Sequence, residues 1–470
     1  MLIQGASLED GRPRDIRVER GRVTDIGSIP ARPGESVLDA RGGVLLPGLH
    51  DQHMHVAALA ASLTSVRCGP PEVTDADAFA ACLRRPGGGW LRATGYHESV
   101  AGMLDARLLD CIAPTRPLRV QHRSGRMWFF NSVGLDTVLS RAVAPPELER
   151  INGRFTGRLL DGDAWLKEAL GSEPPSFSAV GSMLGRVGVT GLTDMSPAND
   201  ARMATHFAAE MRTQSLPQTV MLAGALSLSD RDMANSLQLG PAKLHLHEAH
   251  LPPFDAVVHF VRFAHEAGRP VAVHAATEVE LVYALSAVNE AGAMAGDRIE
   301  HASVAPESAV SEISRMGLAV VTQPQFVHER GDRYRADVDE RAWPHLYRLR
   351  TFLNAGVSLG GGSDAPFGGF DPWAAMAAAV SRRTRGGACI GESEALTPEQ
   401  ALDLYLRDPA DLSRRRRLSV GMVSDLCLLD RPWREARHSL SASHVRACFI
   451  RGRRVFDREG ATVRESGATV

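Results

Sequence analysis

The sequence predicts an α/β fold, a (β/α)₈ TIM barrel with a small β-sandwich domain formed by both chain termini and an insertion between barrel strands 1 and 2. Three observations predict it. Short apolar runs alternate with helical patterns through the centre of the chain, as in a parallel sheet with crossover helices. Both ends instead show short strand-like segments punctuated by Gly and Pro. A long stretch, about residues 57–180, separates the first strand-like run from the second.

The central segment, residues 44–417, is expected to form the barrel because it contains eight strand-like runs. These runs are Val44–Pro47, Val189–Thr193, Thr219–Leu222, Lys243–Leu246, Val271–His274, Arg298–His301, Ala319–Thr322 and Val357–Gly360. Eight such units favour a closed barrel over an open sheet. We expect the insertion to lie over the C-terminal mouth of this barrel.

Residues 1–43 and 418–470 are expected to combine into one β-sandwich domain, because neither end has enough apolar area to fold alone. The strand-like segments are Met1–Ile3, Asp15–Glu19, Arg22–Ile26, Ser36–Asp39, Asp425–Leu429, Ser443–Ile450 and Arg453–Asp457.

Composition narrows the class of partner. The 470 residues carry a net charge of −2, which argues against a polyanion such as nucleic acid. No apolar run reaches the roughly 18 residues of a membrane span, and no signal peptide precedes the first strand. The six cysteines are scattered, so neither disulfides nor a thiolate zinc site is expected, and a reducing cytoplasm is the default. We expect a small-molecule substrate and leave a homo-oligomer open.

His53 and His55 are the first candidate metal ligands. They are two residues apart on extended chain, so both rings face the same side, as two imidazoles on one divalent metal ion require. His245 and His247 have the same spacing. Spacing alone therefore does not identify the metal site.

Polar residues at the ends of other strands strengthen the case for His53. His274 ends the fifth strand, His301 ends the sixth, and Asp364 follows the eighth. Taken singly, each histidine could equally have a structural role, and Asp364 could equally be the N-cap of a helix. The carboxyl ends of barrel strands meet at one face, however, so we expect the four side chains to lie together, with His53 and His301 within about 10 Å.

Lys243 is one of only two lysines, with Lys167, among 53 basic residues. Arginine replaces lysine on surfaces but not where a neutral amine must react. Lys243 is predicted to open the fourth strand, where burial in the barrel mouth would lower its pKa. Its neutral amine could then take up carbon dioxide as a carbamate that bridges two cations. A salt-bridged lysine at a strand end is the alternative.

These residues resemble the amidohydrolase superfamily. The resemblance lies in the opening Pro47-Gly48-x-x-Asp51-x-His53-x-His55, the strand-four lysine, the later strand-end histidines and Ser363-Asp364-Ala365-Pro366. The segment Val420–Leu426 is similar to the segment at which the chain of family members leaves the barrel and re-enters the β-sandwich domain. The resemblance covers essentially the whole chain. The long insertion is similar to the one found in the branch of the family that includes N-substituted formamide deformylase-like enzymes.

The resemblance implies a metal centre with six ligands. They are His53, His55 and Asp364 for one divalent ion, His274 and His301 for the other, and carboxylated Lys243 as the bridge. Imidazole and oxygen ligands favour Zn²⁺, as one or two ions, with manganese and iron left open. The implied chemistry is hydrolysis of a C–N bond of the amide, cyclic amide or N-formyl type. A metal-activated hydroxide would attack, with Asp364 as the catalytic proton shuttle.

Candidate substrate contacts lie near the strand ends and in the insertion. They are Tyr96, His97, Arg126, Trp128, Gln323 and Phe367. Arg126 stands where relatives carry a histidine, and would favour a carboxylate-bearing substrate if it reaches the pocket. The aromatic candidates could equally be core residues. Residues 324–345 are expected to form a loop in which the segment Arg330–Arg335 is either a lid or a solvated stretch.

Two other functions remain open on the same scaffold. One is a metal-dependent decarboxylase or isomerase, and the other is a non-catalytic scaffold protein. Substrate assays separate the first from a hydrolase, and metal analysis of the purified protein separates the second.

Overall fold

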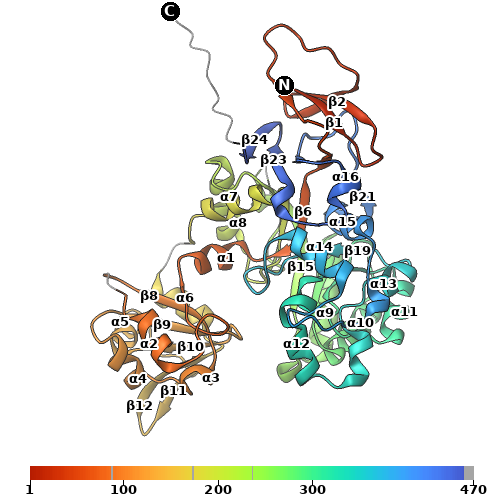
Figure 1. Ribbon diagram of the computed structural model, residues 1–470. Coiled ribbons are helices and arrows are strands. Elements are labelled where there is room, and N and C mark those ends of the chain that lie inside the picture. The colour runs from red at the N-terminus through yellow and green to blue at the C-terminus, as the bar shows by residue number, and fades with distance from the viewer. Residues whose placement is uncertain (86–87, 172–173, 235–236, 460–470) are drawn as a thin grey trace, which may run out of the picture. The chain divides into compact units, whose positions relative to one another are not determined.

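The computed structural model describes residues 1–85, 88–171, 174–234 and 237–459 (Figure 1). The chain divides into two compact units, Met1–Val56 with Ser176–Val470 and Ala57–Pro175. The first unit holds the barrel and both termini. The second lies where the sequence predicts the insertion; its position over the barrel mouth stays a prediction. No helix among the described residues is long and apolar enough to cross a membrane.

The first unit is built on an eight-stranded parallel sheet, ordered β19-β18-β17-β16-β15-β14-β13-β6. The predicted (β/α)₈ TIM barrel is thereby confirmed. The strands are β6 (Leu49–Met54), β13 (Val189–Asp194), β14 (Thr219–Gly224), β15 (Leu237–His245), β16 (Val271–Ala275), β17 (Arg298–His301), β18 (Ala319–Thr322) and β19 (Leu359–Gly361). Residues that follow β19 bond to β6: Asp364 N donates to the His53 carbonyl at 2.7 Å, and Ser363 N donates to Asp51 Oδ1 at 3.0 Å.

The predicted first barrel strand was wrong. The Val44–Pro47 run forms β5 (Leu45–Pro47), which pairs antiparallel with β22 (Leu426–Leu429) in the sheet of the termini. The barrel strand β6 begins only two residues later. Both segments are fully buried, so hydrophobicity could not separate them, and the break between them is Gly48 alone. His53 therefore lies within the strand rather than beyond its end.

The predicted start of the fourth strand was also wrong. β15 begins at Leu237, so Lys243 is its third residue from the end instead of its first. The Gly240-Pro241 pair suggested a strand boundary. In the structure Pro241 lies where the pairing of β15 with β14 shifts register, and proline is tolerated at such an irregularity because no ladder N–H is needed there.

Helices alternate with the barrel strands. They are α7 (Ser178–Arg186), α8 (Ala201–Arg212), α9 (Phe254–Glu266), α10 (Glu278–Ala291), α11 (Glu307–Met316), α12 (Gln325–Asp337), α13 (Arg350–Asn354), α14 (Pro372–Ser381) and α15 (Pro398–Leu406). The predicted loop of residues 324–345 is instead α12 followed by the 3₁₀ helix η3 (Glu340–His345). α12 buries Phe326, Val327 and Gly331, which lie on one face of the helix. The many charged residues of the segment made this helical periodicity hard to recognise in the sequence.

Both termini build two four-stranded sheets with a common core. The strands are β1 (Leu2–Ser7), β2 (Pro13–Glu19), β3 (Arg22–Gly27) and β4 (Val37–Asp39) in one sheet, and β5, β22, β23 (Val445–Ile450) and β24 (Arg453–Asp457) in the other. Ile3 and Val18 from the first sheet share one apolar cluster with Leu428 and Phe449 from the second. Each end of the chain thus supplies the apolar surface that the other lacks.

The unit Ala57–Pro175, orange in Figure 1, has its own six-stranded sheet, ordered β11-β12-β10-β9-β8-β7. Its strands are β7 (Val66–Arg67), β8 (Leu91–Tyr96), β9 (Leu118–His122), β10 (Met127–Phe130), β11 (Leu148–Ile151) and β12 (Arg154–Leu160). Its helices are α2 (Ala76–Leu83), α3 (Glu98–Ala101), α4 (Ala106–Ile112), α5 (Ser132–Leu139) and α6 (Asp163–Leu170); α1 (Val56–Leu63) leads into it. Two apolar clusters, around Phe79 and Phe130, fill this unit.

Candidate functional site

Histidines from three barrel strands and the residue after β6 converge at one end of the barrel. The ring centroid of His53 lies 5.3 Å from that of His55 and 4.9 Å from that of His301. The ring centroid of His301 lies 4.3 Å from that of His274. The requirement that His53 and His301 lie within about 10 Å is therefore met.

Asp364 joins these histidines from the far end of the barrel sequence. Its Oδ1 lies 3.1 Å from His55 Nε2 and 3.5 Å from His53 Nε2. One ligand atom from each of His53, His301 and Asp364 lies within 4.8 Å of the others, and all three residues are buried. Asp364 and His301 have φ values of 54° and 72°, in the left-handed region where such strain clusters at functional sites.

Gly362 makes this approach possible. A Cβ placed on it would lie 2.6 Å from His53 Cβ and 2.7 Å from His53 N. Any side chain at this position would therefore push the segment that carries Asp364 away from β6.

Glu300 fixes the protonation of His53. Its Oε2 lies 2.5 Å from His53 Nδ1, and its Oε1 accepts from Arg298 Nε at 2.5 Å. An ionised carboxylate only accepts hydrogen bonds, so Nδ1 of His53 carries the proton and Nε2 presents its lone pair. Glu300 was not predicted as a site residue. Its signal was a pair of charged residues, Arg298 and Glu300, alternating along a strand expected to be apolar.

Gln323 performs the same function for His301. Its Oε1 accepts from His301 Nδ1 at 2.6 Å, which leaves His301 Nε2 free to bind a metal ion. Gln323 was predicted as a substrate contact; its side chain is fully buried, its Nε2 has no hydrogen-bond partner among the described residues, and the contact with substrate stays a prediction. Ser196 Oγ lies 3.1 Å from His55 Nδ1 and completes a set of outer partners.

Lys243 is buried, with 4% of its surface exposed, and its Nζ has no hydrogen-bond partner among the described residues. Burial lowers the pKa of Lys243 to about 8, in spite of attraction to Glu300 and Asp364. A buried amine without a partner is costly. Its environment therefore fits a bound group that would complete it, such as a carbamate on a metal ion.

The charge state of the cluster suits metal ligands. Burial lowers the pKa values of His53, His274 and His301 below their ordinary range, so these imidazoles are neutral at pH 7. Burial alone would raise the pKa of Asp364, but the hydrogen bond with His55 and the attraction of His301, His53 and His55 together outweigh it and hold that pKa well below its usual value. The site thus combines neutral imidazoles with an ionised carboxylate.

His245 also belongs to this site. It ends β15 directly opposite His274 on β16, and the two rings stack with centroids 4.1 Å apart and planes 11° apart. His245 was not among the predicted ligands, because its spacing from His247 equals that between His53 and His55. His245 lies two residues after Lys243, so both side chains leave the strand on the same side, with His245 at the exposed edge.

The remaining predicted substrate contacts fall into two groups. Phe367, 47% exposed, places its ring edge against His55 with centroids 5.6 Å apart. The other four lie in the unit Ala57–Pro175. There, Tyr96 donates to the Gly102 carbonyl, His97 caps α3, Arg126 is ion-paired with Asp161, and Trp128 donates to Asp163.

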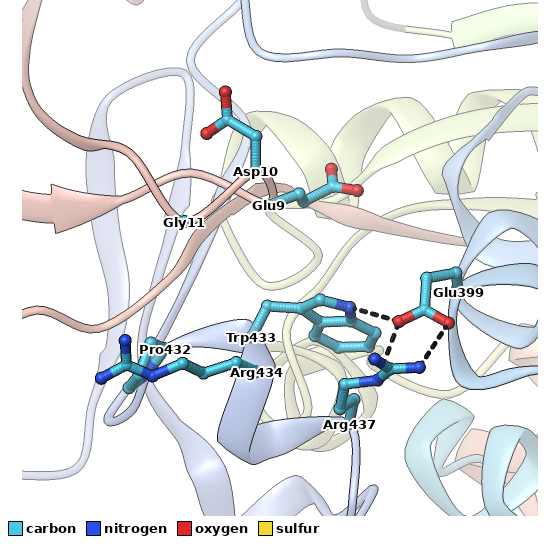
Figure 2. Close-up of a pocket in the computed structure, with 8 residues that line it drawn as sticks. All are labelled: Glu9, Asp10, Gly11, Glu399, Pro432, Trp433, Arg434 and Arg437. Carbon is cyan, nitrogen blue, oxygen red and sulfur yellow. Dashed lines mark hydrogen bonds and ion pairs between the residues drawn. The ribbon is translucent and has the colours of Figure 1, made fainter.

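A hollow of about 560 Å³ lies elsewhere in the first unit, beside α16 (Trp433–Ala436). Figure 2 shows Trp433 and Arg437 both directed at the carboxylate of Glu399, at 3.0 Å and 3.1 Å. The lining of this hollow contains none of the residues that converge around His53. We therefore assign the functional site to the barrel.

Comparisons with known proteins show the family and the fold of the chain. The model of the amidohydrolase family matches residues 36–456. The chain is 26% identical to an N-substituted formamide deformylase of Arthrobacter pascens, over 95% of each chain. It is 23% identical to the putative amidohydrolase YtcJ of Bacillus subtilis, over 96% of this chain and 97% of that one. An uncharacterised metal-dependent hydrolase from Pyrococcus horikoshii has the same fold, with a TM-score of 0.77, 18% identity and coverage of 94% of this chain and 99% of that one.

Proposed function

The chain belongs to the amidohydrolase family, and from this premise we propose that it is a metal-dependent hydrolase of a C–N bond other than a peptide bond. The proposed substrate is a small molecule of the amide, cyclic amide or N-formyl type. One observation carries the proposal: the ligand atoms of His53, His301 and Asp364 gather within 4.8 Å in a buried site at the barrel strand ends.

The residues present fit a divalent cation, and Zn²⁺ is the proposed ion because the donors are imidazole nitrogens and carboxylate oxygens. The proposed ligands are His53, His55 and Asp364 for one ion, His274 and His301 for a second, and carboxylated Lys243 between them. Two observations support this set. Glu300 and Gln323 hold protons on the far nitrogens of their histidines, and the buried Nζ of Lys243 lacks any partner among the described residues.

A divalent cation at this place supplies a water nucleophile at neutral pH and polarises the scissile carbonyl. The residues of the chain do the rest. Oδ1 of Asp364, ionised and 3.1 Å from His55 Nε2, accepts the proton of the nucleophile and returns it to the leaving nitrogen. His245 and Phe367 border the place where the leaving group departs, because each ring packs on a histidine of the cluster.

The N-formyl class is the first to test, because the relative from Arthrobacter pascens is an N-substituted formamide deformylase. The experiment is to express the protein with zinc, measure bound metal, and assay N-formylbenzylamine beside hydantoin and N-acetylbenzylamine. We expect about one to two ions per chain. Activity on at least one compound should disappear with a chelator and return with zinc.

The control is protein carrying Asp364→Asn, prepared and loaded in the same way. A purified protein without stoichiometric transition metal, even when zinc is supplied, would contradict the proposal. So would a product formed by loss of carbon dioxide or by rearrangement, which would point instead to the decarboxylase or isomerase alternative.

A further inference from the structure

Arg330 on α12 is a cation close to the proposed metal centre and outside the ligand set. Its guanidinium carbon lies 3.7 Å from the centroid of the Phe326 ring. Its Nη2 donates to the carbonyl of Phe367 at 2.6 Å. Arg330 is half-buried, so it has lost part of its hydration.

The guanidinium of Arg330 forms no ion pair within 4.0 Å with any carboxylate that the structure describes. Arg17 and Arg298 are each paired with a glutamate, and the buried Arg269 instead donates five hydrogen bonds to backbone carbonyls. Glu329 and Asp364 attract Arg330 only through longer-range electrostatics. A half-buried guanidinium that makes a single hydrogen bond to the described residues is costly, and a ligand carboxylate would reduce that cost.

Arg330 is connected to the histidine cluster through Phe367. The carbonyl it binds belongs to Phe367, whose N–H donates to the Asp364 carbonyl at 2.8 Å. The ring of the same Phe367 packs edge-on against His55. One short turn therefore links the guanidinium to the cluster.

Two tyrosines supply further hydrogen-bonding groups beside Arg330. Tyr334 and Tyr347 both interact electrostatically with Arg330, and their hydroxyls lie 3.0 Å apart. Tyr347 is buried against Phe326, whereas Tyr334 is half-buried on the same helix as Arg330. The guanidinium thus packs over an aromatic ring and, among the described residues, donates one hydrogen bond, to the carbonyl of Phe367.

We propose that Arg330 binds a carboxylate of the substrate. The substrate class is then an N-formyl or N-acyl amino acid, in which a carboxylate and an apolar side group are attached near the scissile amide. A guanidinium offers parallel N–H groups that match a carboxylate, and Phe326 with the exposed Phe367 offers apolar walls. The proposal rests on the proposed function for the reaction. It moves carboxylate recognition from Arg126, which is paired with Asp161 in the other unit, to Arg330.

Binding tests the inference without any turnover. The probes are 3-phenylpropionate and its neutral amide, 3-phenylpropionamide, titrated by calorimetry into the zinc-loaded protein. We expect the carboxylate to bind at least about 10-fold more tightly, and Arg330→Met to weaken it by about 10- to 100-fold, as for a charge-assisted hydrogen-bonded pair. Arg333→Met is the matched control, because Arg333 lies on the same helix and pairs with Asp337 at 2.7 Å. Arg330→Lys should restore binding only in part.

Kinetics with a matched substrate pair completes the test. N-formylphenylalanine and N-formyl-2-phenylethylamine differ only by the carboxylate. Arg330→Met should reduce kcat/KM for the first by about 10- to 100-fold more than for the second, mainly through KM. An equal loss on both substrates, or carboxylate binding that survives Arg330→Met, overturns the inference. If the zinc-loaded protein hydrolyses neither compound while carboxylate binding still depends on Arg330, the proposed reaction fails on this substrate class and the binding site stands.

Discussion

The part of the chain that the structure describes contains two clusters of two histidines and one carboxylate, and they differ in which histidine nitrogen carries the proton. In the barrel, His53 and His301 donate from Nδ1 to Glu300 and Gln323. Their Nε2 lone pairs are therefore turned toward Asp364. This is the arrangement that a metal ion requires.

The second cluster, His97, Glu98 and His122 in the insertion, has the opposite arrangement. Nδ1 of each histidine accepts a backbone N–H at 3.1 Å, from Ser99 and Ser124. Each Nε2 therefore carries the proton, and that of His122 donates to Glu98 at 3.0 Å. The Glu98 side chain is also 52% exposed. Proximity of ligand-type residues is thus not enough, because the partner of the far nitrogen decides whether a histidine can bind metal.

Replacing the carboxylate in each cluster should give the largest contrast. Asp364→Asn removes a proposed ligand and the proton shuttle, so turnover should fall by about 10²- to 10⁴-fold or more. Glu98→Gln should leave metal content and thermal stability unchanged. Metal analysis and initial rates on both variants check this. Equal loss of metal in the two variants would mean that both clusters bind an ion.

Glu300→Gln tests whether the outer carboxylate sets the protonation of His53. Loss of such a partner costs about 10- to 100-fold in metal affinity. Glu394→Gln is the control, because Glu394 is also buried and paired with an arginine, Arg348, away from the cluster. Competition with a zinc indicator gives both affinities. If Glu394→Gln weakens zinc binding as much, the effect of Glu300 is general destabilisation.

Gln323 should have a smaller effect, since a neutral acceptor holds the proton of His301 less strongly than a carboxylate. Gln323→Leu should weaken zinc binding by about 10-fold, at the low end for an outer partner. Gln323→Glu keeps an acceptor at the same place and should restore the affinity. A Leu variant that binds zinc like the parent would show that His301 needs no partner.

Lys243→Met should give the smallest of these effects on the stability of the metal-free protein, and that effect should be a gain. Burial lowers the pKa of Lys243 to about 8 from 10.5, so the metal-free fold is destabilised by roughly 3 kcal/mol below pH 8. This cost declines as the pH rises toward 10.5. Metal-free Lys243→Met should therefore melt about 2–3 °C higher at pH 7 and match the parent near pH 10.5.

The exposed Lys167 provides the control for this prediction, and Lys167→Met should not change the melting temperature. Metal content should fall in Lys243→Met alone. A lower melting temperature for the metal-free Lys243→Met protein at pH 7 would mean that the amine has a stabilising partner.

The residues of the barrel cluster could be predicted from the sequence because each ends or follows a barrel strand. His274, His301 and Asp364 carry that signal individually. The boundary between β5 and β6 could not be predicted, because two buried strands of different sheets are separated by Gly48 alone. Outer partners such as Glu300 were missed for another reason. Their role depends on which atom of a neighbouring histidine ring they contact. The periodic pattern of apolar and polar residues in the sequence carries no information about such contacts.

The hydrogen bonds that join the segment after β19 to β6 have a consequence for biosynthesis. Asp364 meets His55 across 309 residues of sequence, and Ser363 meets Asp51 across 312. Contacts of such sequence separation form late, because the intervening chain must be ordered first. A nascent chain still lacking Asp364 cannot assemble the cluster, so metal loading should follow barrel closure rather than guide it. Before the barrel closes, His53 and His55 should bind a wrong metal ion only weakly, since they are only two of the proposed ligands.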